Sequence, residues 1–305
     1  MTHSYQFFNY QLETDLVFPE LTQKESTGEI IRVCKGRPAA ADYETVHQWM
    51  NDDSVEIDCQ CAGDVIRLEF PDLLVAYIDT GRTLILYEPA AAVPEYSIRH
   101  LLLDQVLPRL VSALGNLVVH ASCVTIGART VAFTGKTGSG KSTFAASLVK
   151  DGWSVLSDDC LLVRVGNDVE VQGSYPGLRL DPDVAESVFQ SRRNHSMVSH
   201  YTSKQRIELN DSVFGEPQRL DMVICLKESA SITMRNLSGA TAVLSLVSES
   251  FCLDPTDKQR AREQLKIISD MVDTGTPVFE LSYPRDLSQM PEVKTELLNS
   301  FELVN

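Results

Sequence analysis

The residues from Gly135 to Ser142 read GKTGSGKS and match the pattern G-x-x-x-x-G-K-[ST]. Glycines at three of these positions, Gly135, Gly138 and Gly140, leave the backbone free to turn its N–H groups inward around an anion. The lysine and the hydroxyl that follow stand where they can reach phosphate oxygens and a magnesium ion. The segment predicts a phosphate-binding loop, which requires a strand before it and a helix after it.

The flanking residues have the pattern that such a loop requires. The run 131–134 is short and apolar, as in a buried strand, and residues 142–150 carry apolar side chains at helical spacing. A second apolar run, 153–157, ends in two adjacent carboxylates, Asp158 and Asp159. We therefore expect a nucleotide site. The alternative is a decayed loop that no longer binds.

The composition restricts the partners that the chain can have. It has 305 residues, 43% of them hydrophobic and 23% charged, which is typical of a globular protein with one elaborated domain or two domains. With 27 Lys and Arg against 42 Asp and Glu, the net charge is −15. Nucleic acid and anionic membranes would repel such a chain, so we expect neither as a general partner.

The same sequence indicates a cytoplasmic protein. Its first residues contain neither a basic start nor an apolar run long enough for a signal peptide or a membrane span. Seven cysteines spread over the chain do not form a disulfide framework and fit a reducing compartment.

Residues 1–94 read as a separate β-rich domain, and residues 95–305 as the domain that carries the glycine-rich loop. The boundary is expected at the small, proline-bounded segment 89–94. Three roles stay open for the first domain: binding a substrate protein, holding a homo-oligomer together, or covering one side of the second domain. Its strand-like runs are 28–33, 55–59, 65–70, 73–78 and 84–87.

In the second domain, residues 96–114 predict an amphipathic helix that Pro108 kinks or divides. A strand over 117–126 carries His120 and returns through a turn into the glycine-rich loop. A hairpin around 166–168 indicates a mixed sheet. The polar segment 191–204, with Arg192 and Arg193, is expected to be mobile and to lie near the substrate. Further strands are expected at 204–209, 220–226, 232–235 and 278–281, and helices at 182–189, 240–247, 257–272 and 291–303.

Three blocks, Val119-His120-Ala121-Ser122, the loop through Thr143, and Ser157-Asp158-Asp159, resemble the catalytic domain of HPr kinase/phosphorylase. Within that superfamily the chain is most similar to shorter HPr-kinase-like proteins, including kinases that modify lasso-peptide precursors. The resemblance implies an α/β fold: a P-loop kinase domain of the phosphoenolpyruvate-carboxykinase-like type with a mixed sheet, preceded by a smaller β-rich domain.

The resemblance also implies roles for individual residues. Lys141 and Ser142 would hold the phosphates of ATP and Mg²⁺, and Asp158 would take the proton from an attacking serine hydroxyl. Asp159 would orient that site or bind its metal, and His120 would lie beside the transferring phosphate. The nucleotide-binding set would be Gly135, Lys136, Thr137, Gly138, Ser139, Gly140, Lys141, Ser142, Thr143 and Arg179. The alternative for the two aspartates is a Walker B pair that binds Mg²⁺ through water.

The chain departs from the family at one motif. The family's Glu-Ile-Arg-Gly-Leu-Gly signature aligns with residues 174–179, which read Ser-Tyr-Pro-Gly-Leu-Arg and lack the glutamate. Phosphorylase activity is therefore less expected than kinase activity. Arg179, Lys204 and Arg206 are candidate phosphate-directed cations in its place, and solvated surface charge is the alternative for each.

Three functions are compatible with these residues. The first is an ATP-dependent kinase that phosphorylates a serine hydroxyl on a peptide or small protein. The second is a kinase for free serine or a similar small alcohol. The third is a regulatory module that binds ATP without catalysis, which would have no chemical need for the pair Asp158-Asp159 beside Lys141.

Overall fold

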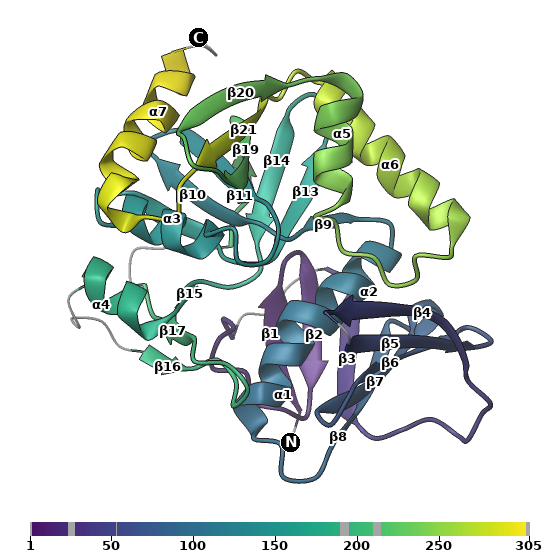
Figure 1. Cartoon of the computed structure of the whole chain (residues 1–305). Helices are drawn as coiled ribbons and strands as arrows, with labels where there is room; N and C mark the ends of the chain where they lie inside the picture. Colours follow the sequence, from purple (N-terminus) through teal and green to yellow (C-terminus); the bar gives the residue numbers. More distant parts are fainter. Residues whose placement is uncertain (1, 24–27, 53, 190–194, 210–214, 303–305) are drawn as a thin grey trace. The chain divides into compact units, whose positions relative to one another are not determined.

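The structure, a computed structural model, describes residues 2–23, 28–52, 54–189, 195–209 and 215–302 (Figure 1). Its contacts divide the chain into two compact units. Unit 1 consists of Met1–Asn116, Met197–Ser203 and Phe251–Glu263, and unit 2 of Leu117–Ser196, Lys204–Ser250 and Gln264–Asn305. The boundary expected between residues 94 and 95 lies inside unit 1.

Unit 1 contains an eight-stranded sheet in the order β1-β2-β3-β8-β7-β6-β5-β4. Its strands include three that the sequence pattern did not predict, β1, β2 and β4. The first two form a hairpin of alternating polar and apolar residues, and β4 is a mostly exposed edge strand without an apolar run. The bounds are His3–Phe7, Tyr10–Thr14, Ile30–Lys35, Glu44–Asn51, Ser54–Ala62, Val65–Phe70, Leu74–Asp79 and Leu84–Pro89 for β1 to β8.

A helical segment follows the sheet in the same unit. It runs as α1 (Glu95–Leu101), a π-helical stretch (Leu102–Val106) and α2 (Leu107–Ala113). Pro108 has no N–H to donate to the carbonyl four residues back, so the widened turns lie just before it, where the sequence predicted a kink. The segment contacts the sheet near both ends of α2, because Arg109 lies 5.0 Å from the Trp49 ring centroid and Asn116 donates to Tyr10 at 2.9 Å.

Unit 2 is built on a six-stranded sheet in the order β12-β10-β11-β19-β21-β20. The pairs β11–β19 and β19–β21 are parallel and the others antiparallel, so the predicted mixed sheet in an α/β fold is confirmed. The central strand β11 leads into the glycine-rich loop. The bounds are Ser122–Ile126 for β10, Arg129–Thr134 for β11, Ser154–Ser157 for β12, Met222–Glu228 for β19, Thr233–Leu237 for β20 and Val278–Tyr283 for β21.

The strand predicted over 117–126 is divided between two sheets. Its first part, β9 (Leu117–Val119), joins a four-stranded sheet in the order β18-β14-β13-β9, and its second part is β10. His120 lies at the break between them rather than within a strand. The predicted hairpin is confirmed as β13 (Leu161–Val165) and β14 (Val169–Gly173), and β18 is Gln218–Arg219.

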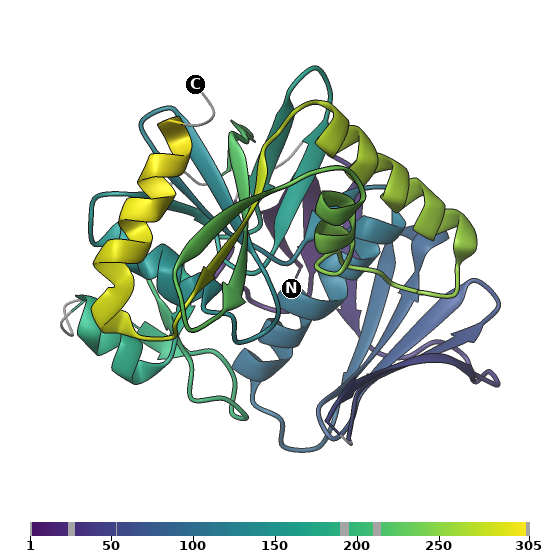
Figure 2. The same ribbon diagram turned by 45° about the horizontal axis from the view of Figure 1, so that its top comes forward.

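Both faces of the six-stranded sheet are covered with apolar side chains. One face packs with α3, α4 and α7, and the other packs with α5, the part of α6 in unit 2, and β13 and β14 (Figure 2). The helices are α3 (Lys141–Val149), α4 (Pro182–Phe189), α5 (Gly239–Val247), α6 (Lys258–Asp273) and α7 (Met290–Glu302), and a three-stranded sheet joins β15 (Leu178–Leu180), β17 (Gln205–Ile207) and β16 (His195–Met197).

The described residues contain no helix that is both long and apolar enough to cross a membrane.

The packing under the glycine-rich loop yields a stability prediction. Phe133 of β11 is fully buried, and its ring centroid lies 4.8 Å from that of Phe144 on α3. Phe133→Ala should lower the free energy of unfolding by about 3–5 kcal/mol, measured by urea denaturation. The control Leu298→Ala removes a side chain that is 51% exposed and should change it by about 0.5 kcal/mol or less. Equal effects of the two substitutions would contradict the described core.

Candidate functional site

The glycine-rich loop has the strand, loop and helix order that the sequence predicted. It begins where β11 ends and leads through Gly140 into α3. Gly135, Gly138 and Gly140 all have positive φ, at 133°, 80° and 95°, which side chains with a Cβ disfavour. A Cβ on Gly135 would also lie 2.6 Å from the carbonyl oxygen of Leu226 on β19. The glycines therefore allow the loop to lie close against the neighbouring parallel strand.

Lys141, the first residue of α3, is buried under this loop. Its Nζ donates to the carbonyl oxygens of Gly135 at 2.5 Å and Lys136 at 3.4 Å. Burial lowers the pKa of Lys141, and the carboxylates of Glu249, Asp159 and Asp158 oppose that effect. The ammonium group of Lys141 is thus hydrogen-bonded to loop carbonyls. An anion bound inside the loop would attract it away from them.

The other residues of the loop differ in exposure. Lys136 and Thr137 are exposed, and Thr143 is half-buried on the first turn of α3. The Ser139 hydroxyl is buried and makes no hydrogen bond within the described parts of the chain. An unpaired buried hydroxyl beside Gly135 is a donor that a ligand in the loop would satisfy.

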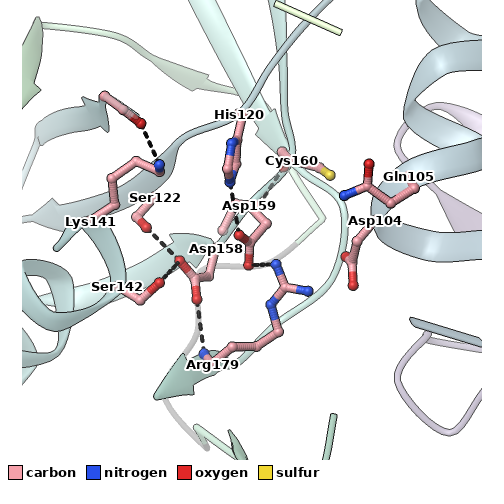
Figure 3. A network of polar contacts seen from close by, with 12 residues as sticks. Asp104, Gln105, His120, Ser122, Lys141, Ser142, Asp158, Asp159, Cys160 and Arg179 are labelled. Carbon is pink, nitrogen blue, oxygen red and sulfur yellow. Dashed lines mark hydrogen bonds and ion pairs between the residues drawn. The ribbon is translucent and has the colours of Figure 1, made fainter. Parts of the chain in front are cut away.

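Asp158 is a buried carboxylate that joins several elements of unit 2 (Figure 3). Its Oδ1 accepts hydrogen bonds from the hydroxyls of Ser142, at 3.0 Å, and of Ser122. Its Oδ2 accepts one from the backbone N–H of Arg179 at 2.9 Å. Asp158 therefore connects the start of α3 with β10 and β15.

Asp159 points to a different set of partners (Figure 3). Its Oδ1 lies 3.1 Å from Nε2 of His120, and its Oδ2 forms an ion pair with the Arg179 guanidinium. The backbone of Asp159 has a φ of 82°, which is uncommon for a residue with a side chain. The structure thus brings together all four residues that the sequence singled out for chemistry: His120, Lys141, Asp158 and Asp159.

The two neighbouring carboxyl groups have different proton affinities. Burial and the charge of Asp159 raise the pKa of Asp158 to about 6. Burial acts on Asp159 too, but the Arg179 guanidinium and His120 outweigh it and hold the pKa of Asp159 well below its usual range. Asp159 is therefore ionised at neutral pH, whereas Asp158 titrates close to it.

Sequence reasoning gave no role to Ser122, although its hydroxyl binds Asp158. The signal that could have found it is the pairing of β10 with β12, because the pair Cys123↔Ser157 places Ser122 next to the residue that follows β12. Of the candidate cations in 191–206, Arg192 and Arg193 lie outside the described residues. Arg206 is buried, with its guanidinium 5.0 Å from the Tyr175 ring centroid, so it is not a solvated surface charge.

Magnesium fits the oxygen atoms present in this region. No group of three or more His, Cys, Asp and Glu side chains suited to a metal ion occurs in the described parts of the chain. Mg²⁺ does not need such a cage, because it is usually held by one or two carboxylates together with substrate phosphates and water. The hydroxyl of Ser142 is an oxygen that suits it, and a carboxylate oxygen of Asp158 lies 3.0 Å from that hydroxyl. Asp159, the predicted metal ligand, contacts His120 and Arg179, and its role toward a metal stays a prediction.

The chain matches solved structures but no protein-family model. No curated protein matches it either. Among solved structures, it is similar to the HPr(Ser) kinase/phosphatase from Coxiella burnetii, with a TM-score of 0.32 and 12% sequence identity. The match covers 60% of this chain and 95% of that chain. Such a loose superposition carries no argument about activity, so the HPr-kinase-like resemblance and its lasso-peptide subgroup stay predictions.

The raised pKa of Asp158 predicts how stability changes with pH. An unfolded chain loses this proton near the ordinary value of 3.8, whereas the folded protein keeps it until about pH 6. The folded state binds more protons between these values, so stability should fall as pH rises from about 4 to about 6. At about 1.4 kcal/mol per pKa unit, the loss is about 3 kcal/mol.

Asp158→Asn should remove this fall, measured as the free energy of unfolding in urea at intervals across the same pH range. The diagnostic quantity is the slope of the unfolding free energy against pH. Its absolute value is not diagnostic, because asparagine also changes the hydrogen bonds to Ser122 and Ser142. Asp159 titrates below this pH range, because its pKa is lowered. Its contribution to the free energy of unfolding would be lost there as pH falls. The same slope in the parent and in Asp158→Asn would contradict the assignment.

Proposed function

We propose that this protein is an ATP-dependent kinase that transfers the γ-phosphoryl group to an alcohol. The observation that carries the proposal is the 3.0 Å hydrogen bond between Ser142 and Asp158. It joins the helix start after a glycine-rich loop to a pair of carboxylates. Phosphoryl transfer needs these parts together, because its catalysis is mostly positioning and neutralisation of charge.

The glycine-rich loop would bind the phosphates. Its backbone N–H groups and the N-terminus of α3 favour an anion, and Lys141 supplies a cation that now rests on loop carbonyls. The hydroxyl of Ser142 would hold Mg²⁺ together with phosphate oxygens and water, and the bound ion would neutralise charge on those phosphates. Arg179, whose guanidinium pairs with Asp159 and whose backbone N–H donates to Asp158, supplies a second cation near these carboxylates.

Asp158 is the proposed proton acceptor. In the reaction, the oxygen of the acceptor hydroxyl forms a bond to the γ-phosphorus, the bond to the β–γ bridging oxygen breaks, ADP leaves, and the hydroxyl proton passes to the carboxylate. A pKa of about 6 suits this role, because such a group is ionised at neutral pH and still accepts a proton readily. Asp159 and His120, joined at 3.1 Å, would position the group beside it.

The acceptor class rests on the sequence resemblance alone. We infer a serine hydroxyl on a peptide or small protein, in the cytoplasm. A small-molecule alcohol is the alternative acceptor. A module that binds ATP without catalysis is disfavoured by the pair Asp158 and Asp159, for which binding alone has no chemical need beside Lys141.

Labelled ATP tests the activity directly. Purified protein incubated with γ-labelled ATP, Mg²⁺ and an extract of its source cells should transfer label to a peptide or small protein. Lys141→Ala should abolish the transfer and tight ATP binding in calorimetry, because it removes the cation nearest the phosphates. The control Lys150→Ala removes an exposed lysine beyond the other end of α3 and should change neither.

The location of the label separates the alternatives. Label in a metabolite would show that the acceptor is a small alcohol rather than a peptide. Label only in free phosphate would contradict kinase activity. Equal ATP affinity of the parent and Lys141→Ala would show that the glycine-rich loop does not bind the nucleotide.

The role of Asp158 has its own test. Asp158→Asn is nearly isosteric but cannot accept a proton, so it should leave ATP affinity within a few fold and lower the transfer rate by roughly 10² or more. Calorimetry with ATP and Mg²⁺, together with single-turnover rates, measures both. Loss of Mg²⁺-dependent ATP binding along with the rate would assign Asp158 to the metal, and the proton acceptor would then be sought at Asp159.

A further inference from the structure

Two side chains near the end of β21 hold the outer side of the glycine-rich loop. The hydroxyl of Tyr283, the last residue of β21, donates to the carbonyl oxygen of Ser139 at 3.0 Å. Two residues later, the Arg285 guanidinium donates to the carbonyl oxygen of Gly138. Both contacts are on the second half of the loop, whereas Lys141 binds carbonyls of its first half.

Tyr283 is held rigidly in this place. It is only 4% exposed, its ring centroid lies 6.0 Å from that of Phe144, and its carbonyl accepts from Ser229 at 3.0 Å. A Cβ on Gly140 would lie 2.6 Å from its hydroxyl oxygen, so the glycine permits the approach. Burial raises the pKa of Tyr283 to about 12, which keeps the hydroxyl protonated and able to donate.

Arg285 is the more exposed of the two residues. Its side chain is 53% exposed, and Glu228 at the end of β19 lies 3.7 Å from it. Its guanidinium would lie 3.5 Å from a Cβ on Gly138, so this part of the loop also runs close to it. One fixed and one exposed donor thus engage two consecutive carbonyls of the loop.

This arrangement matters because a peptide unit directs its carbonyl and its N–H in opposite directions. When the carbonyl of Ser139 is held on the outside, the N–H of Gly140, which follows it, faces the interior of the loop. The N–H of Ser139, which follows Gly138, donates to the carbonyl of Lys136 at 2.9 Å, so the contact of Arg285 with Gly138 fixes that turn of the loop. We propose that Tyr283 and Arg285 are positioning residues that preorganise the loop for the phosphates of a nucleotide. The inference rests on the proposed function, and it adds Tyr283 at the end of β21 and Arg285 just after it, about 140 positions further along the chain.

The test uses the full-length protein with Tyr283→Phe, Arg285→Met and the matched control Lys227→Met. The control removes one positive charge from a 62% exposed lysine on the neighbouring strand β19. The first measurement is amide hydrogen exchange of residues 135–141 without nucleotide. Both loop variants should exchange faster there, with no change in residues 154–157, and the control should match the parent.

The second measurement is ATP affinity by calorimetry, together with the KM for ATP and kcat. One hydrogen bond is worth about 0.5–1.5 kcal/mol, so each loop variant should bind ATP roughly two- to tenfold more weakly. The KM for ATP should rise, and kcat at saturating ATP should stay within about twofold of the parent. The reason is that neither Tyr283 nor Arg285 has a described contact with Asp158 or Asp159. Arg285→Lys, which keeps a donor, should recover part of the affinity.

The outcomes separate this inference from the proposed function. Unchanged loop exchange and unchanged ATP affinity in both variants, with a parent that binds ATP, would overturn the positioning role alone. A parent that binds no ATP would overturn the proposed function and, with it, the nucleotide part of this inference. The exchange measurement in the absence of nucleotide would still decide whether Tyr283 and Arg285 hold the loop.

Discussion

A buried carboxylate needs hydrogen-bond donors, and the site is arranged around the groups that donate hydrogen bonds to Asp158. Its side chain is almost fully buried, and three hydrogen bonds from three segments satisfy it. An ionised carboxylate without such partners would be expensive to bury. Ser122, Ser142 and the backbone of Arg179 therefore connect β10, α3 and β15 to the end of β12. Removing any one of them would leave part of the charge unsatisfied.

The Arg179 guanidinium explains why two adjacent carboxylates are electrostatically tolerable. Two adjacent acidic side chains repel each other, and the strain falls on the one without a cation. Arg179 pairs with Asp159 through its guanidinium while it gives only its backbone N–H to Asp158. Arg179 lowers the pKa of both carboxyl groups, but it outweighs burial only at Asp159, because burial and the charge of Asp159 keep the pKa of Asp158 raised. This asymmetry is what a phosphoryl-transfer site needs, with one group fixed as an anion and another able to exchange a proton.

The sequence predicted the parts of the fold that depend on local patterns. Glycine spacing and flanking apolar runs predicted β11, the loop and α3, and turn residues predicted the hairpin of β13 and β14. Strand β4 was missed because its mostly exposed residues carry no apolar run. Strands β1 and β2 alternate polar and apolar residues, which is the pattern of a half-buried strand, so the sequence did contain a signal for them. The division of 117–126 into β9 and β10 was missed as well, because two sheets share one continuous apolar segment whose break at His120 leaves no local signal.

The candidate site was predictable to a similar extent. Its charged residues follow from motif positions, and the structure brings them together. Partners from distant segments do not follow, because nothing near Tyr283 or Arg285 in the sequence indicates the loop about 140 positions earlier. The burial of Arg206 beside Tyr175 could not be predicted either, because it depends on the pairing of β15 with β17.

A crystal structure with Mg²⁺ and a non-hydrolysable ATP analogue would test the central claim most directly. We predict the β- and γ-phosphates inside residues 135–140, with Lys141 moved from the carbonyls of Gly135 and Lys136 onto phosphate oxygens. We also predict Mg²⁺ at the Ser142 hydroxyl, within reach of Asp158. An analogue bound elsewhere, with Lys141 still on the loop carbonyls, would contradict this claim.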